Sequence, residues 1–140
     1  MTIDINNSTD LVVDKKSFSQ VAKKVLSGEN RENACRQAGR QTLSLAFVDA
    51  EEIKKLNKKF RGKNQATDVL SFELKEGNYL GEVVICPEVV EQNAKKYGVL
   101  VEKEMMKVFV HGILHLCGYD HEKSAKEAEI MEKKQEKYLN

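Results

Sequence analysis

The sequence predicts a single α+β domain over residues 1–140, with three or four strands and four or five helices. Its 140 residues suit one domain with a sizeable buried core. Short stretches of alternating apolar and polar residues, typical of strands, are partly segregated from longer stretches with the helical period. The chain has one proline and no internal repeat, so we expect no linker.

The first 48 residues predict two strands and one helix. Residues 2–6 and 42–48 alternate apolar and polar side chains, as strands with one buried face do. Residues 15–27 carry an apolar stripe with i, i+3, i+4, i+7 spacing, and Gly28 is expected to end that helix. Residues 29–41 are polar and predict neither state.

The next helix is marked at both ends. Asp49 and Glu52 have the spacing of a capping box, in which the two side chains satisfy free N–H groups of the first turn. The helix is expected to run to about Phe60 and to stop at Gly62.

The second half of the chain predicts a hairpin and three helices. Residues 68–74 and 80–86 resemble strands, with a turn at Gly77 and Asn78 between them. The helices are expected from Pro87 to just before Gly98, over 101–117 with Gly118 as a left-handed cap, and over roughly 122–138.

Composition and cysteine usage predict a cytoplasmic protein without a membrane segment. The net charge of +1 gives no general signal for a nucleic-acid partner. Cys35, Cys86 and Cys117 are far apart and form no Cys-x-x-Cys motif, which is typical of a reducing compartment. The N-terminus lacks the features of a signal peptide, and the longest uncharged run near the histidines is too short to span a bilayer.

All three histidines lie in the stretch HGILHLCGYDH, residues 111–121. Three randomly placed histidines would share such a window only about 2% of the time. His111 and His115 are four apart in an expected helix, so they lie on one face, and the break at Gly118 allows His121 to return to them. Catalytic zinc commonly has three protein ligands and one open position for water, whose pKa the ion lowers toward neutrality. The pattern predicts one zinc ion per chain, bound by His111, His115 and His121, in preference to three ordinary half-buried histidines.

The same spacing matches the metzincin signature H-E-x-x-H-x-x-G-x-x-H at every position but one. Gly112 stands where the general-base glutamate of a peptidase belongs, which argues against peptide hydrolysis by the usual route. A glycine there permits either close backbone packing or room for a bulky substrate. Cys117 lies two residues past His115 and should turn away from the histidine face into the core. Met131 is expected to pack in the core as well, not to form a Met-turn.

The histidine stretch resembles the signature of the YbeY family of bacterial endoribonucleases and ribosomal-RNA maturation factors. Two other stretches support the resemblance, which covers about residues 43–121. FRGKNQATDVLSFEL at 60–74 is similar to the family's Arg-containing loop and strand, and LGEVVIC at 80–86 is similar to its G-D-I-x-I strand. Glu82 departs from the usual Asp of that strand, which leaves the role of the position open.

The resemblance implies a zincin-like fold, with a small mixed sheet beside the metal helix. It also implies a single-strand-specific, zinc-dependent endoribonuclease in 16S ribosomal-RNA 3′-end maturation and ribosome quality control. Ribosomal RNA, the ribosomal subunit and ribosomal proteins are the implied partners. His111 and Arg61 are the implied catalytic residues, with Arg61 expected on an exposed loop.

A guanidinium can clamp phosphate oxygens and stabilise charge that grows in a transition state. Lysines around Arg61 would add contacts to backbone phosphates, although a solvated helix face is the usual explanation of such a run. These lysines are Lys54, Lys55, Lys58, Lys59 and Lys63.

Two rival functions and two mechanisms stay open at this stage. A peptidase could take its base from Glu82 or Asp120, and a ribosome assembly factor could use a zinc ion that is only structural. Asp120 is equally suited to orienting a histidine and to capping the turn. In a nuclease, either water or the neighbouring 2′-hydroxyl could attack the phosphorus, and no unambiguous base decides between them.

Overall fold

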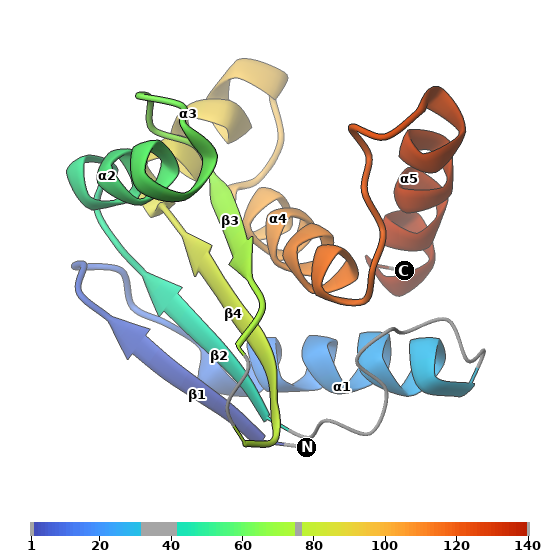
Figure 1. Ribbon diagram of the computed structural model, residues 1–140. Helices are drawn as coiled ribbons and strands as arrows, with labels where there is room; N and C mark the ends of the chain where they lie inside the picture. Colours follow the sequence, from blue (N-terminus) through green and yellow to red (C-terminus); the bar gives the residue numbers. More distant parts are fainter. Residues whose placement is uncertain (1, 32–41, 75–76, 140) are drawn as a thin grey trace.

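In the computed structural model, the described residues, 2–31, 42–74 and 77–139, form a four-stranded mixed sheet with five helices (Figure 1). The strand order is β1-β2-β4-β3; β1, β2 and β4 are parallel, and β3 runs antiparallel to β4 at one edge. The strands are β1 (Thr2–Asn7), β2 (Thr42–Phe47), β3 (Val69–Phe72) and β4 (Tyr79–Ile85). The helices are α1 (Lys15–Arg31), α2 (Ala50–Arg61), α3 (Pro87–Tyr97), α4 (Val101–Leu116) and α5 (Ala125–Leu139). The predicted α+β class is confirmed.

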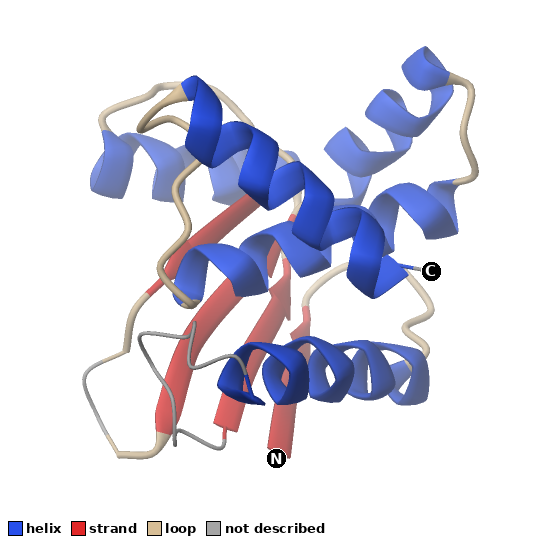
Figure 2. Ribbon diagram, turned by 90° about the vertical axis from the view of Figure 1, so that its right-hand side faces the viewer, coloured by secondary structure: helices blue, strands red, loops and turns tan. Residues whose placement is uncertain are grey.

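Helices cover both faces of the sheet (Figure 1, Figure 2). Alternate side chains of β2 are buried on one face and form the larger core with α1 and α4. On the other face, Leu70 of β3 and Val84 of β4 pack with Ile53 of α2 in a smaller core. Helix α5 packs against α4 and α1. Because β3 and β4 both contribute to both cores, these two strands fix α4 relative to α2.

Gly112 sets how closely α4 approaches the sheet. A Cβ atom at this position would lie 2.7 Å from Cγ1 of Val83, closer than real Cβ atoms come to a neighbour. The Ser71 hydroxyl donates a hydrogen bond of 2.9 Å to the Gly112 carbonyl, which joins α4 to β3 at the same level. Close packing is therefore the role of this glycine, and a glutamate side chain does not fit there.

Helix α4 ends in a Schellman motif that reverses the chain. Gly118 has φ of +113°, and its N–H donates to the His115 carbonyl at 3.0 Å. The N–H of Tyr119 donates to the Leu114 carbonyl at 3.1 Å. Glycine adopts positive φ at little cost, so the predicted break after α4 is confirmed, and it directs residues 119–122 back toward the helix.

The predicted end of α1 at Gly28 is wrong, because the helix continues to Arg31. Gly28 lies against α5, and a Cβ atom there would be 2.5 Å from the Tyr138 hydroxyl oxygen. This glycine provides space for a side chain distant in sequence and does not end the helix. The polar stretch 29–41 is thus helical up to Arg31, and its remainder, with Cys35, lies outside the described residues.

The last helix begins at Ala125 and not near residue 122. The Ser124 hydroxyl accepts a hydrogen bond of 3.1 Å from the Glu127 N–H, as an N-cap residue does. Asp49 caps α2 in the same way, accepting from the Glu52 N–H at 2.8 Å, and Gly62 ends α2 with φ of +71°. Among the described residues, no helix is both long and apolar enough to cross a bilayer.

Candidate metal centre

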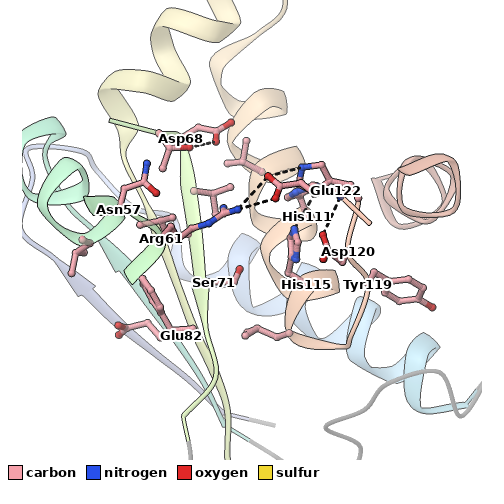
Figure 3. Close-up of a pocket in the computed structure, with 18 of the residues that line it drawn as sticks. Asn57, Arg61, Asp68, Ser71, Glu82, His111, His115, Tyr119, Asp120 and Glu122 are labelled. Carbon is pink, nitrogen blue, oxygen red and sulfur yellow. Dashed lines mark hydrogen bonds and ion pairs between the residues drawn. The ribbon is translucent and has the colours of Figure 1, made fainter. Parts of the chain in front are cut away.

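The structure brings together the three histidines that the sequence singled out. His111 and His115 lie one turn apart on α4 (Figure 3), and the reversal after Gly118 returns His121 to them. One ring nitrogen from each histidine lies within 4.8 Å of the other two, and Nε2 of His115 is 3.1 Å from Nδ1 of His121. Zinc–imidazole bonds are about 2.0–2.1 Å long, so nitrogens this close can share one ion. The three histidines can therefore hold a metal ion.

Gln135 of α5 orients His111. Its side-chain oxygen Oε1 lies 2.6 Å from Nδ1 of His111, and Gln135 is buried. An amide oxygen only accepts, so Nδ1 carries the proton and Nε2 keeps its lone pair for a metal ion. Gln135 was not among the residues predicted from the sequence, although it shares an i, i+4, i+7 face with two other buried residues, Met131 and Tyr138.

Burial keeps the imidazoles of α4 neutral. Loss of solvation, together with the neighbouring His111 and His121, lowers the pKa of His115 to about 4. Loss of solvation also lowers the pKa of His111, and the hydrogen bond to Gln135 partly offsets this by raising it. Neutral rings have a free lone pair near neutral pH, as metal ligands require.

A buried carboxylate anchors the turn between His115 and His121. Glu29 of α1 is fully buried and accepts a hydrogen bond of 2.6 Å from the hydroxyl of Tyr119. Lys134 lies 3.3 Å from the same carboxylate, and Tyr138 donates to it as well. These contacts join α1, α5 and the turn, so His121 is carried by a segment that is tied to the core.

Arg61 approaches the turn that carries His121 from the end of α2. It is the last residue of α2, not a loop residue, and it is exposed as expected. Its Nη2 donates to both carboxylate oxygens of Glu122, at 3.1 and 3.2 Å (Figure 3), and Lys63 lies 3.8 Å from that carboxylate. The charge of Arg61 lowers the pKa of the Glu122 carboxyl. Because Glu122 directly follows His121, this ion pair places the guanidinium at the rim of the histidine cluster.

A cleft of about 1260 Å³ contains these groups. Its walls are the end of α2, strand β3, helix α4 and the turn after α4. Of the basic residues around α2, Arg61 and Lys63 line it, whereas Lys54, Lys55, Lys58 and Lys59 do not. Its acidic residues are Asp68, Glu73, Glu82, Glu104, Asp120 and Glu122. Lys107 of α4 lines it as well, so the cations of the cleft are Arg61, Lys63 and Lys107, not the lysine run on α2.

The other candidate residues have identifiable contacts. Glu82 lines the cleft and accepts a hydrogen bond of 2.7 Å from the Ser44 hydroxyl on β2. Asp120 accepts from the Glu122 N–H at 3.0 Å, so it caps the turn. Cys117 and Met131 are buried in the larger core, as expected.

Comparison with known proteins identifies the family. A family model described as Endoribonuclease YbeY matches residues 3–140. The chain belongs to the YbeY family. The family resemblance seen in the histidine stretch thus extends over nearly the whole chain.

Relatives in this family come from several bacteria. An Endoribonuclease YbeY from Thermotoga neapolitana is 47% identical over 116 residues, 83% of this chain and 77% of the relative. One from Staphylococcus saprophyticus is 38% identical over 130 residues, 86% of this chain and 82% of the relative. The solution structure of a Thermotoga maritima protein is similar with a TM-score of 0.61 and 36% identity, covering 98% of this chain and 86% of that one.

Proposed function

We propose that this chain is a zinc-dependent endoribonuclease that cleaves single-stranded RNA. We further propose that it acts in the cytoplasm in ribosomal-RNA processing, including maturation of the 16S 3′ end, and in ribosome quality control. Its partners would be ribosomal RNA, the ribosomal subunit and ribosomal proteins. One observation carries the proposal: three histidines that can hold a metal ion share a cleft with the Arg61 guanidinium.

The donor set fits zinc. Three imidazole nitrogens with an open fourth position are a common catalytic zinc site, and neutral ligands leave the charge of the ion undiminished. When bound, zinc would supply a Lewis acid that polarises a phosphoryl oxygen or lowers the pKa of a water molecule. His111, His115 and His121 would be its ligands, and Gln135 would hold His111 in the tautomer that has Nε2 free.

Arg61 would bind the scissile phosphate. Its contact to Glu122 uses one nitrogen, Nη2, whereas a guanidinium offers five N–H groups in a planar fork. Both partners are about half exposed, so the pair is worth little in water and a phosphate can replace the carboxylate. In that position the guanidinium would stabilise the negative charge that grows on the phosphoryl oxygens.

The decisive experiment measures metal and RNA cleavage together. Purified protein should contain about one zinc per chain and should cut a single-stranded ribosomal-RNA fragment far faster than the same sequence in a duplex. Chelator should abolish cleavage and added zinc should restore it. The end groups of the products identify the nucleophile, because a 2′,3′-cyclic phosphate forms only when the 2′-hydroxyl attacks.

Two outcomes would reject the proposal. Cleavage of a peptide library without cleavage of RNA would indicate a peptidase, with Glu82 or Asp120 as candidate base. A zinc ion with a fully occupied protein coordination shell and no hydrolysis of either substrate would indicate a structural metal in an assembly factor.

A further inference from the structure

Phe60 is a large apolar side chain on the wall of the metal cleft. It is 56% exposed and immediately precedes Arg61 at the end of α2. Single exposed apolar residues are common on protein surfaces. This ring, however, lies next in sequence to Arg61, the residue proposed to bind the scissile phosphate. The neighbouring groups indicate what the ring can bind.

The ring of Phe60 is held in place. Its centroid lies 5.1 Å from that of Phe72, at an interplanar angle of 62°, an edge-to-face contact. Phe72 is the last residue of β3 and packs on the smaller core. A ring that is supported by a fixed neighbour loses little freedom when a ligand stacks on it.

One cation lies over the same ring, and two more belong to the same cleft. Nζ of Lys59 lies 5.2 Å from the centroid of Phe60, and Arg61 follows in sequence. Lys63 lines the cleft with Arg61. An aromatic face among cations is the arrangement that single-stranded nucleic acids bind, because bases stack on the ring while phosphates meet the charges.

We propose that Phe60 is a base-stacking site for single-stranded RNA, which holds a nucleobase next to the phosphate that Arg61 binds. The inference rests on the proposed function and adds a subsite to it. Every base has a π-face, so stacking on Phe60 selects for unpaired bases without selecting a sequence. Bases in a duplex are already stacked within the helix, and Phe60 therefore contributes to the preference for single strands.

Tyr97 provides a matched comparison. It also lines the cleft and is 61% exposed, but it ends α3, whereas Phe60 directly precedes Arg61. In each case the preceding lysine lies over the ring, at 5.2 Å for Phe60 and 5.6 Å for Tyr97, so the two residues share exposure, cleft and a neighbouring cation. They differ in the residue that follows, which is Arg61 after Phe60 and Gly98 after Tyr97.

The test compares Phe60→Leu, Phe60→Trp and Tyr97→Leu with the metal-loaded wild type. The substrates are single-stranded RNA oligonucleotides with 2-aminopurine placed at successive positions. Phe60→Leu keeps an apolar cover for Phe72 but has no aromatic face. It should raise KM about 5- to 150-fold, the range of one base–aromatic stack, with a smaller change in kcat. Phe60→Trp should retain the wild-type KM or lower it.

Fluorescence locates the base. In the wild type and in Phe60→Trp, 2-aminopurine at one position should be quenched on binding, and this quenching should disappear in Phe60→Leu. Zinc content and Tm, measured on the same samples, should match the wild type in all three variants. Unchanged KM and quenching in Phe60→Leu, or an equal loss in Tyr97→Leu, would overturn the assignment. A wild type that neither binds nor cleaves RNA would instead reject the proposed function, and this inference with it.

Discussion

Helices α4 and α2 both bring side chains to the same cleft, but they are built in opposite ways. Nine of the sixteen residues of α4 are buried, and its glycine lies against β4. Only Ile53 and Asn57 are buried in the twelve residues of α2. One helix is enclosed by the fold, and the other rests on the sheet by one face.

This difference separates two kinds of functional group. The candidate ligands His111 and His115 on α4 are fixed by packing and by Gln135, which suits a metal site, because ligand positions must be correct within a few tenths of an ångström. Arg61 at the end of α2 is held by an exposed ion pair, which can be exchanged. We therefore expect changes at α4 to act through metal binding, and changes at α2 to act on RNA with the metal retained.

The largest effect is expected for His115→Ala. It leaves two imidazoles, which rarely hold zinc tightly, so stoichiometric zinc and RNA cleavage should both be lost. Elemental analysis of the purified variant measures the first and a cleavage assay the second. In the wild type, chelator should lower Tm, because an ion that binds only the native state stabilises it by mass action. Stoichiometric zinc in a His111→Ala/His115→Ala double variant would contradict the ligand assignment.

Arg61→Ala should lower the cleavage rate by about 10²-fold or more, the scale of losing one preorganised donor to transition-state charge. Zinc content should be unchanged, and the free energy of unfolding should stay within about ±0.5 kcal/mol, because the side chain is exposed. Arg61→Lys should recover only part of the rate, since an ammonium lacks the two-pronged geometry.

Lys63→Ala is the matched control for Arg61, because Lys63 also faces Glu122 and also lines the cleft. It should reduce the rate much less than Arg61→Ala. Full activity in Arg61→Ala would remove Arg61 from the site. Loss of zinc in that variant would mean that Arg61 has a structural role. Changes at α2 would then also act through metal binding, as changes at α4 do.

Gln135→Leu tests how α5 supports α4. Removing the acceptor leaves the Nδ1–H of His111 unpaired, and zinc affinity should fall about 10- to 100-fold, as for other partners of metal-ligating histidines. Competition with a chelator of known affinity measures this directly, without an activity assay. Gln135→Glu keeps an acceptor and should retain most of the affinity. Met131→Leu, on the same buried face, is the control; an equal loss there would reflect packing and not the hydrogen bond.

The sequence could predict the α4 site better than its surroundings, for a physical reason. The three histidines lie within eleven residues, so a helix, a glycine break and a short return determine their proximity. The contacts of Gln135 and Glu122 depend on how distant elements pack, which local periodicity does not contain. Gly28 shows the same limit of local sequence patterns. Helix propensity favours the end of a helix at this glycine, but the close approach of Tyr138 is the reason that a glycine is needed there.

The smallest expected effect concerns the lysines of α2 that lie outside the cleft lining. Lys58 and Lys59 are exposed, and reversing both charges should weaken RNA binding mainly through long-range attraction. If each contacts one phosphate of a single strand, the slope of log K against log[salt] should decrease in magnitude by about 0.7 for each lost contact. Lys15→Glu/Lys16→Glu makes the same change in net charge at the start of α1 and should leave the slope nearly unchanged. An equal decrease of the slope in the two double variants would mean that only net charge matters. An unchanged slope in both would mean that the α2 lysines are an ordinary solvated face and that RNA contact is confined to Arg61 and the cleft.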